Sequence, residues 1–183
     1  MIGIISRLTD QKGLDLVNRV IEQILDENTQ LVVIGTGEPR YENLFKHFQW
    51  KYPDRVSANI FFSEQRAHKL YAAADAMLVP SRFEPCGLTQ LIALRYGTIP
   101  IVRETGGLKD TVSPYNEYEN SGNGFSFGNY DSYDMLNVIN YAKTIYFTQN
   151  EKWQEIIIRA MKSDFSWNYS ADQYAGMYNW LSN

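Results

Sequence analysis

The sequence has few of the residues on which disulfides and metal clusters depend. It holds a single cysteine, Cys86, among 183 residues, which excludes an intrachain disulfide and fits a reducing compartment. Two histidines and one cysteine are too few for a usual zinc cluster, and no aspartate-rich metal-binding motif occurs. We therefore expect neither a metal site nor a metal cofactor.

Long apolar runs and an excess of positive charge are also lacking. No apolar run approaches membrane-spanning length, so we expect no membrane partner. The formal net charge of -4 argues against a general nucleic-acid binder. The segment Met1 to Ile5 is too short for the core of a signal peptide and is typical of a strand. Because the first residues already have the pattern of a strand, we expect the chain to begin in the middle of a fold and to be a domain excised from a longer protein.

What the sequence does contain is an alternation of strand and helix patterns. Strands are expected at 2–6, 30–34, 56–62, 76–79, 98–102 and 124–127, and helices at 13–25, 39–50, 64–74, 88–96, 131–148, 151–163 and 170–181. A short helical turn opens at Gly106-Gly107. Strands without polar alternation, separated by amphipathic helices, indicate a parallel sheet covered on both faces. The prediction is one α/β domain over 1–183, a doubly wound Rossmann-like parallel sheet.

The segment Ser81 to Gln90 carries the most chemical information. It follows the apolar run Ala76 to Pro80 and precedes a helix, so it lies at the carboxyl end of a strand, where such sheets bind ligands. Glu84 can accept hydrogen bonds from sugar hydroxyls, and the free N–H groups of the first helical turn can hold a diphosphate. A sugar attached to a diphosphate needs both features.

Four motifs occur in order: Ser6 to Asp15, Gly35 to Glu38, Pro80 to Gln90 and Thr105 to Val112. Together they resemble the C-terminal half of bacterial glycogen synthases and plant starch synthases, over almost the whole chain. That family has two Rossmann-like domains (the GT-B arrangement) with a deep cleft between them. Related retaining transferases often carry a second glutamate eight positions after the first. Here that position is Ile92, which argues against the broader sucrose-synthase-like group.

The resemblance implies roles for named residues. The catalytic residues would be Arg7, Lys12 and Glu84: the two cations neutralise the diphosphate in place of a metal ion, and the carboxylate binds glucose hydroxyls. The backbone N–H groups of Cys86 and Gly87 would assist Glu84, and those of Leu88 and Thr89 would take the diphosphate. The full donor-binding set would be Gly35, Thr36, Gly37, Phe62, Cys86, Gly87, Leu88, Thr89, Thr105, Gly106 and Gly107.

Each of these roles has a structural alternative. Arg7 and Lys12 can be ordinary loop charges, and Glu84 can be a carboxylate stabilised by a helix dipole. The glycines can serve tight turns, and Phe62 can be core rather than a cover for adenine. The C-terminal aromatic residues favour core or interdomain packing over a carbohydrate platform; they are Trp153, Trp167, Tyr169, Tyr174, Tyr178 and Trp180. We expect the helices of 131–181 to pack on the domain and toward the missing N-terminal domain.

The function implied by the resemblance is donor binding in a retaining ADP-glucose:α-1,4-glucan 4-α-glucosyltransferase. Its partners would be ADP-glucose or ADP, the α-1,4-glucan acceptor and the missing N-terminal domain, with no nucleic acid. ADP-glucose would be a substrate, so no cofactor is expected, and the isolated domain would be inactive. The location would be the cytoplasm of a bacterium or the plastid of a plant. Two alternatives stay open: a UDP-sugar-dependent retaining transferase, and a non-catalytic module that binds nucleotide or glucan.

Overall fold

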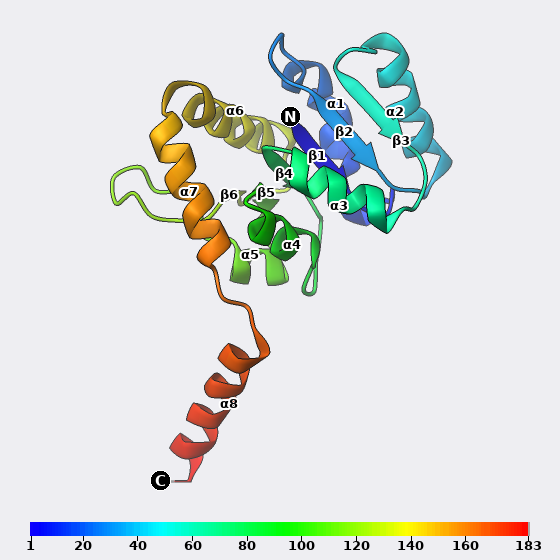
Figure 1. Ribbon diagram of the computed structural model, residues 1–183. Coiled ribbons are helices and arrows are strands. Elements are labelled where there is room, and N and C mark those ends of the chain that lie inside the picture. Colours follow the sequence, from blue (N-terminus) through cyan, green and yellow to red (C-terminus); the bar gives the residue numbers. More distant parts are fainter. Residues whose placement is uncertain (183) are drawn as a thin grey trace.

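The computed structural model describes residues 1–182, and within them one sheet runs through the molecule (Figure 1). Its strands are β1 (Ile2–Ile5), β2 (Leu31–Ile34), β3 (Val56–Asn59), β4 (Ala76–Val79), β5 (Ile99–Arg103) and β6 (Phe125–Phe127). They lie in the order β3-β2-β1-β4-β5-β6, and every neighbouring pair is parallel. The direction of winding therefore reverses between β1 and β4. The predicted doubly wound parallel sheet is confirmed.

The helices cover both faces of the sheet. In chain order they are the 3-10 helix η1 (Asp10–Lys12), α1 (Leu14–Ile24), α2 (Pro39–Lys51), α3 (Glu64–Ala73), α4 (Thr89–Tyr96), α5 (Gly106–Thr111), α6 (Ser132–Thr148), α7 (Asn150–Lys162) and α8 (Trp167–Leu181). One face packs against α1, α2 and α6, and the other packs against α3, α4 and α5. Helix α7 lies beside α6 and α4. No helix within 1–182 is both long and apolar enough to cross a membrane.

Neighbouring residues of a strand contribute their side chains to the cores on opposite faces of the sheet. In β4, Ala76 and Leu78 join the core under α1 and α6, while Met77 joins the core under α3 and α4. Alternate strand residues point to opposite faces, so both sets of side chains are buried only when helices cover both sides. This explains why the central strands β1, β2 and β4 lack polar alternation. Because all neighbouring strands are parallel, their carboxyl ends lie at one edge of the sheet.

The last helix departs from the expectation that the helices of 131–181 all pack on the domain. Helices α6 and α7 do, and Trp153 of α7 is core at 3% exposure. None of the residues of α8 is buried, and Trp167 and Trp180 are 90% and 76% exposed. The extended segment before α8 carries it away from the body (Figure 1). Core packing is thus right for Trp153 and wrong for the α8 aromatic residues, whose packing against another domain stays a prediction.

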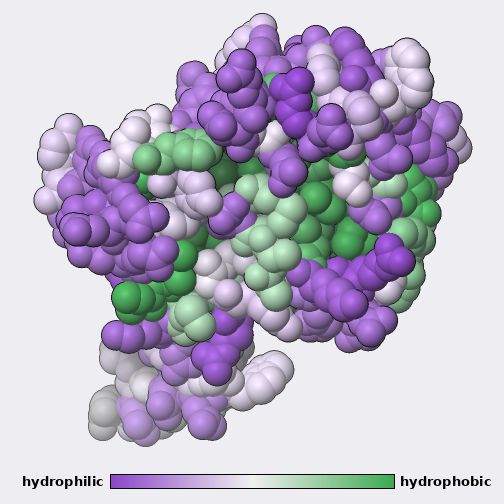
Figure 2. Space-filling view, turned by 45° about the horizontal axis from the view of Figure 1, so that its top comes forward, coloured by the Kyte–Doolittle hydropathy of each residue, from purple (hydrophilic) through white to green (hydrophobic). Residues whose placement is uncertain are grey.

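Apolar side chains also reach the surface of the main body. Figure 2 shows hydrophobic residues in a band across the middle of the face viewed, with hydrophilic residues above it and at the sides. Large side chains that are more than half exposed outside α8 include Phe62, Phe83 and Leu88, all in loops at the carboxyl edge of the sheet. Contiguous exposed apolar surface marks a contact site more often than a free surface.

Candidate functional site

A cavity of about 140 Å³ opens where β1 and β4 end side by side. This is the point at which the winding of the sheet reverses, and open α/β sheets bind ligands there. Its lining combines the ends of the two strands with polar and charged side chains from the loops that follow. The polar lining residues are Ser6, Arg7, Lys12, Ser81 and Thr89.

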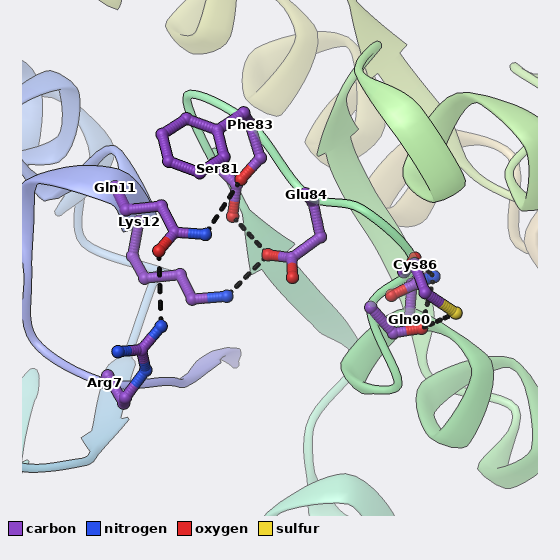
Figure 3. Close-up of polar contacts among 9 residues, drawn as sticks. Arg7, Gln11, Lys12, Ser81, Phe83, Glu84, Cys86 and Gln90 are labelled. Atoms are coloured by element: carbon purple, nitrogen blue, oxygen red, sulfur yellow. Dashed lines mark hydrogen bonds and ion pairs between the residues drawn. The ribbon is translucent and has the colours of Figure 1, made fainter.

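Lys12 lines this cavity and pairs with Glu84, although 72 residues separate the two. The ammonium Nζ of Lys12 lies 2.5 Å from Oε2 of Glu84, and the two side chains are only 16% and 11% exposed. The buried hydroxyl of Ser81 donates to the same oxygen at 3.0 Å (Figure 3). Among the described residues nothing donates to Oε1 of Glu84. One carboxylate oxygen is therefore fixed by two donors, and the other is available as an acceptor.

Gly13 explains why Lys12 reaches this position. The residue has φ of +70°, and a Cβ placed on it would lie 1.9 Å from the carbonyl oxygen of Pro80. Only glycine combines a left-handed backbone with so close an approach. The loop after β1 is thereby pressed against the end of β4. Lys12, which precedes Gly13, comes next to Ser81 and Glu84 as a result.

Arg7 lies on the same loop and is held less tightly. Its side chain is exposed, and its Nη2 donates to Oε1 of Gln11 at 3.2 Å. Gln11 in turn donates through Nε2 to the carbonyl oxygen of Phe83 at 3.3 Å (Figure 3). Sequence reasoning did not single out Gln11. It lies inside the motif Ser6 to Asp15, but its contact with Phe83 spans 72 residues and leaves no local signal.

The loop after β1 is also tied to the turn after β2. Asp10 accepts hydrogen bonds from the hydroxyl of Tyr41 and from Arg40. The Tyr41 hydrogen bond, and then the Arg40 guanidinium, hold the pKa of the Asp10 carboxyl below its usual range. Arg40 also pairs with Glu38 at 2.7 Å. These contacts connect the loop that carries Arg7 and Lys12 to the start of α2.

The predicted segment Gly35-Thr36-Gly37 lies in that second turn. The N–H of Leu8 donates to the carbonyl of Thr36 at 2.9 Å, and the N–H of Glu38 donates to the carbonyl of Leu8 at 2.8 Å. Thr36 and Gly37 are exposed at the carboxyl edge of the sheet. The structure therefore brings this turn beside the loop that carries Arg7. Its contact with a nucleoside stays a prediction.

The residues that lead into α4, from Cys86 to Thr89, are the next members of the predicted donor-binding set. The side chain of Gln90 is buried, and its Nε2 donates to the carbonyl oxygens of Cys86 and Gly87 at 3.0 and 2.9 Å. This fixes the turn through which the chain enters the helix. The helix starts at Thr89, which lines the cavity, while Leu88 before it is 67% exposed. Unpaired N–H groups at such a helix start favour an anion.

Gly106 and Gly107 lie against the loop that carries Glu84. The N–H of Gly107 donates to the carbonyl of Glu84 at 3.2 Å. A Cβ on Gly106 would lie 2.0 Å from that carbonyl oxygen, and one on Gly107 would lie 2.2 Å from the carbonyl oxygen of Cys86. The space beside the Cα atoms of both glycines is filled by the backbone of the Glu84 loop, and their predicted contact with the donor stays a prediction. Thr105, half-buried, immediately precedes them at the start of α5.

Phe62 stands apart from the cavity. Strand β3 ends at Asn59 instead of reaching Phe62, and the Phe62 ring is 89% exposed in the loop that follows. The alternative that it is a core residue is therefore wrong. An exposed ring at the carboxyl edge suits stacking on a base, but that role stays a prediction.

The part of the chain that the structure describes gathers no three His, Cys, Asp or Glu side chains that could hold a metal ion. The charged residues that line the cavity are Arg7 and Lys12, and Glu84 is paired with Lys12. Two cations and one carboxylate with a free oxygen can bind an anionic group and a hydroxyl side by side. This is the pattern that a sugar diphosphate requires.

With this geometry established, comparison with known proteins defines the class. Residues 1–162 match the family model "Glycosyl transferases group 1", and the chain belongs to that family.

Within the family, the chain resembles glycogen and starch synthases, as its motifs indicate. It is 64% identical over 181 residues to the glycogen synthase of Lachnospira eligens and 59% identical to that of Lachnoclostridium phytofermentans. These alignments cover 99% of this chain and 38% of each relative. The catalytic domain of starch synthase IV from Arabidopsis thaliana, solved with ADP and acarbose, superposes with a TM-score of 0.87 at 37% identity. That match covers 97% of this chain and 37% of the other.

Proposed function

We propose that this chain forms the donor-binding part of a retaining ADP-glucose:α-1,4-glucan 4-α-glucosyltransferase. The observation that carries the proposal is the pairing of Glu84 with Lys12, which lines the cavity at the ends of β1 and β4 together with Arg7. The bacterial relatives named glycogen synthases support the glucan as product. The starch synthase solved with ADP and acarbose supports ADP rather than UDP as the nucleotide.

In this proposal the three charged residues divide the donor between them. Lys12 and Arg7 bind the diphosphate, and Oε1 of Glu84 accepts hydrogen bonds from glucose hydroxyls. As the diphosphate binds, it competes with Glu84 for the Lys12 ammonium. Cations placed in advance where negative charge develops lower the barrier to departure of a leaving group. Their two charges perform the task that a metal ion performs in other transferases.

The chemistry needs positioning more than a protein nucleophile. The 4-hydroxyl of the acceptor attacks the anomeric carbon from the face that the diphosphate leaves. The bond between that carbon and the diphosphate oxygen breaks, a bond to the glucan oxygen forms, and the hydroxyl proton passes to the leaving phosphate oxygen. The α configuration is retained. This chain contributes the held diphosphate and sugar, and close placement of the reacting groups supplies much of the acceleration.

The rest of the active site comes from outside this chain. The chain spans about 38% of the length of the relatives it matches. We propose that an N-terminal domain supplies the acceptor site, closes the cleft, and covers the exposed aromatic residues of α8. The isolated chain would then bind ADP weakly and make no glucan. The bacterial relatives favour the cytoplasm over the plastid as its location.

The test is a transfer assay on the full-length protein that contains this chain. ADP-glucose and UDP-glucose, each labelled in the glucose, are offered in parallel with an α-1,4-glucan primer. We expect label in the glucan from ADP-glucose, removable by an enzyme that cleaves α-1,4 bonds, and much less from UDP-glucose. Lys12→Ala should remove the incorporation, whereas Glu151→Ala, an exposed change on α7, should not. Incorporation from UDP-glucose alone, or from neither donor, would contradict the proposal.

A further inference from the structure

Gln11 uses both ends of its side-chain amide to connect two loops of the site. Its Oε1 accepts from Arg7 Nη2 at 3.2 Å, and its Nε2 donates to the carbonyl oxygen of Phe83 at 3.3 Å. Its backbone carbonyl accepts a third hydrogen bond, from the N–H of Arg82 at 2.8 Å. Two of these contacts reach the loop that carries Glu84, and the third reaches Arg7, a cation of the cavity. Figure 3 shows the two contacts of the side chain.

Arg7 depends on this contact for its position. Among residues 1–182, the only hydrogen bond made by the Arg7 side chain is the one to Gln11. An arginine side chain that is free to rotate loses much conformational entropy when a ligand fixes it. A partner that holds the guanidinium beforehand reduces that loss and keeps the donor aimed at the ligand.

Lys12 does not require a neighbouring amide to hold its side chain in position. It is half-buried and paired directly with Glu84 at 2.5 Å. The two cations of the cavity are therefore held by different means: Lys12 by the carboxylate itself, and Arg7 through the amide of Gln11. Because Gln11 also binds the carbonyl of Phe83, the position of Arg7 is linked to the residue next to Glu84.

We propose that Gln11 is a positioning residue that holds Arg7 toward the diphosphate and links it to the Glu84 loop. The role of Gln11 rests on the proposed function, because the ligand toward which Arg7 is held is the diphosphate of ADP-glucose. An amide suits the task better than a carboxylate. It offers an acceptor to Arg7 and a donor to Phe83 without adding a negative charge beside an anionic ligand.

The test is a double-mutant cycle on the full-length protein, with Gln11→Ala, Arg7→Ala and the two combined. ADP affinity is measured by calorimetry, and turnover is measured with ADP-glucose and glucan. We expect Gln11→Ala to weaken ADP binding roughly three- to tenfold, the range for losing one immobilised side chain. Turnover should fall further, by roughly tenfold or more, because the donor is misplaced. In the Arg7→Ala background, Gln11→Ala should change ADP affinity less than twofold.

Two controls separate positioning from folding. Gln23→Ala makes the same change at an exposed site on α1 and should leave ADP affinity and turnover unchanged. Gln11→Met keeps the length of the side chain and removes only its hydrogen bonds. It should reproduce the effect of Gln11→Ala with an unchanged unfolding temperature.

The outcomes are distinct. Equal effects of Gln11→Ala with and without Arg7 would overturn the positioning role, even if the protein transfers glucose as proposed. Coupling in ADP affinity without any glucan synthesis would support the role of Gln11 and overturn the proposed function. Absence of ADP binding by the unaltered protein would overturn both.

Discussion

At the scale of single residues, Lys12 and Arg7 carry the same charge in the same loop but are held differently. Lys12 is part of a half-buried ion pair with Glu84. Arg7 is exposed, and its guanidinium donates a hydrogen bond to the neutral side-chain amide of Gln11. We therefore expect the charge of Lys12 to contribute to the stability of the fold in addition to its proposed role in ligand binding. The charge of Arg7 has no carboxylate partner among the described residues, so we expect its contribution to be to the ligand alone.

This difference predicts different outcomes for two alanine variants of the full-length protein. Lys12→Ala and Arg7→Ala should each lower turnover roughly a hundredfold or more, as expected for losing a preorganised donor. Lys12→Ala should also lower the free energy of unfolding by about 1–3 kcal/mol, because it leaves the Glu84 carboxylate without its cation. Arg7→Ala should leave that free energy unchanged. Denaturant unfolding measured beside the kinetics gives both quantities. Normal turnover in a folded Lys12→Ala protein would remove Lys12 from the reaction.

The proposed role of Glu84 predicts that its removal affects turnover but not nucleotide binding. Glu84→Ala should lower turnover by about two orders of magnitude or more, because the glucose loses a charged partner. ADP affinity should be unchanged or slightly higher, because ADP has no glucose and Lys12 is released from its carboxylate. Calorimetry with ADP and initial rates with ADP-glucose test this. A loss of ADP affinity equal to the loss of turnover would instead assign Glu84 to nucleotide binding.

The sequence was sufficient to name Arg7, Lys12 and Glu84 as candidates, and their catalytic roles stay predictions, but it did not show how the three residues contact one another. The selection came from their place in recognisable motifs after strands. The Lys12–Glu84 contact and the Gln11–Phe83 contact each span 72 residues, and no local pattern encodes such pairs. The role of Gly106 and Gly107 in packing against the Glu84 loop was hidden for the same reason.

At the scale of elements, Gly13 fixes the loop after β1 against the end of β4. Gly13→Ala would place a Cβ 1.9 Å from the Pro80 carbonyl oxygen, at a backbone φ of +70°. We expect a loss of about 2 kcal/mol or more in the free energy of unfolding, from left-handed strain and the clash together.

The matched control is Gly176→Ala in α8, where a new Cβ would have nothing within 4 Å. It should be neutral or should stabilise by up to about 1 kcal/mol, since alanine favours helix. Urea unfolding of both variants measures the contrast. Equal free energies for the two variants would contradict the role assigned to Gly13.

Element prediction succeeded where local periodicity decides the structure. Helix α1 has its apolar residues at helical spacing, and strands β2 and β4 are continuous apolar runs, so these elements were predictable. The 3-10 turn Asp10–Lys12 was not predicted: it spans only three residues without apolar periodicity, and Gly13 at its end packs against Pro80, which is distant in the sequence. The early end of β3 at Asn59 was also missed: the apolar residues Ile60 to Phe62 resemble strand, although Phe62 is exposed.

At the scale of the whole molecule, α8 contributes surface rather than core. None of its residues is buried, so ending the chain after Asp164 should leave the rest of the fold intact. We expect the melting temperature of the shortened chain to stay within about 2 °C of the original, since little burial is lost. Differential scanning calorimetry of both chains measures this. A fall of several degrees would show that α8 packs on the domain.

The central claim is that the cavity between β1 and β4 holds the diphosphate of an ADP-linked sugar. Calorimetric titration of this chain with ADP tests the claim most directly. UDP serves as the competing nucleotide, and Lys12→Ala as the matched variant. We predict weak, saturable binding of ADP to the unaltered chain, weaker binding of UDP, and loss of most ADP affinity in the folded variant. ADP binding that is unaffected by Lys12→Ala, or a preference for UDP, would contradict the account.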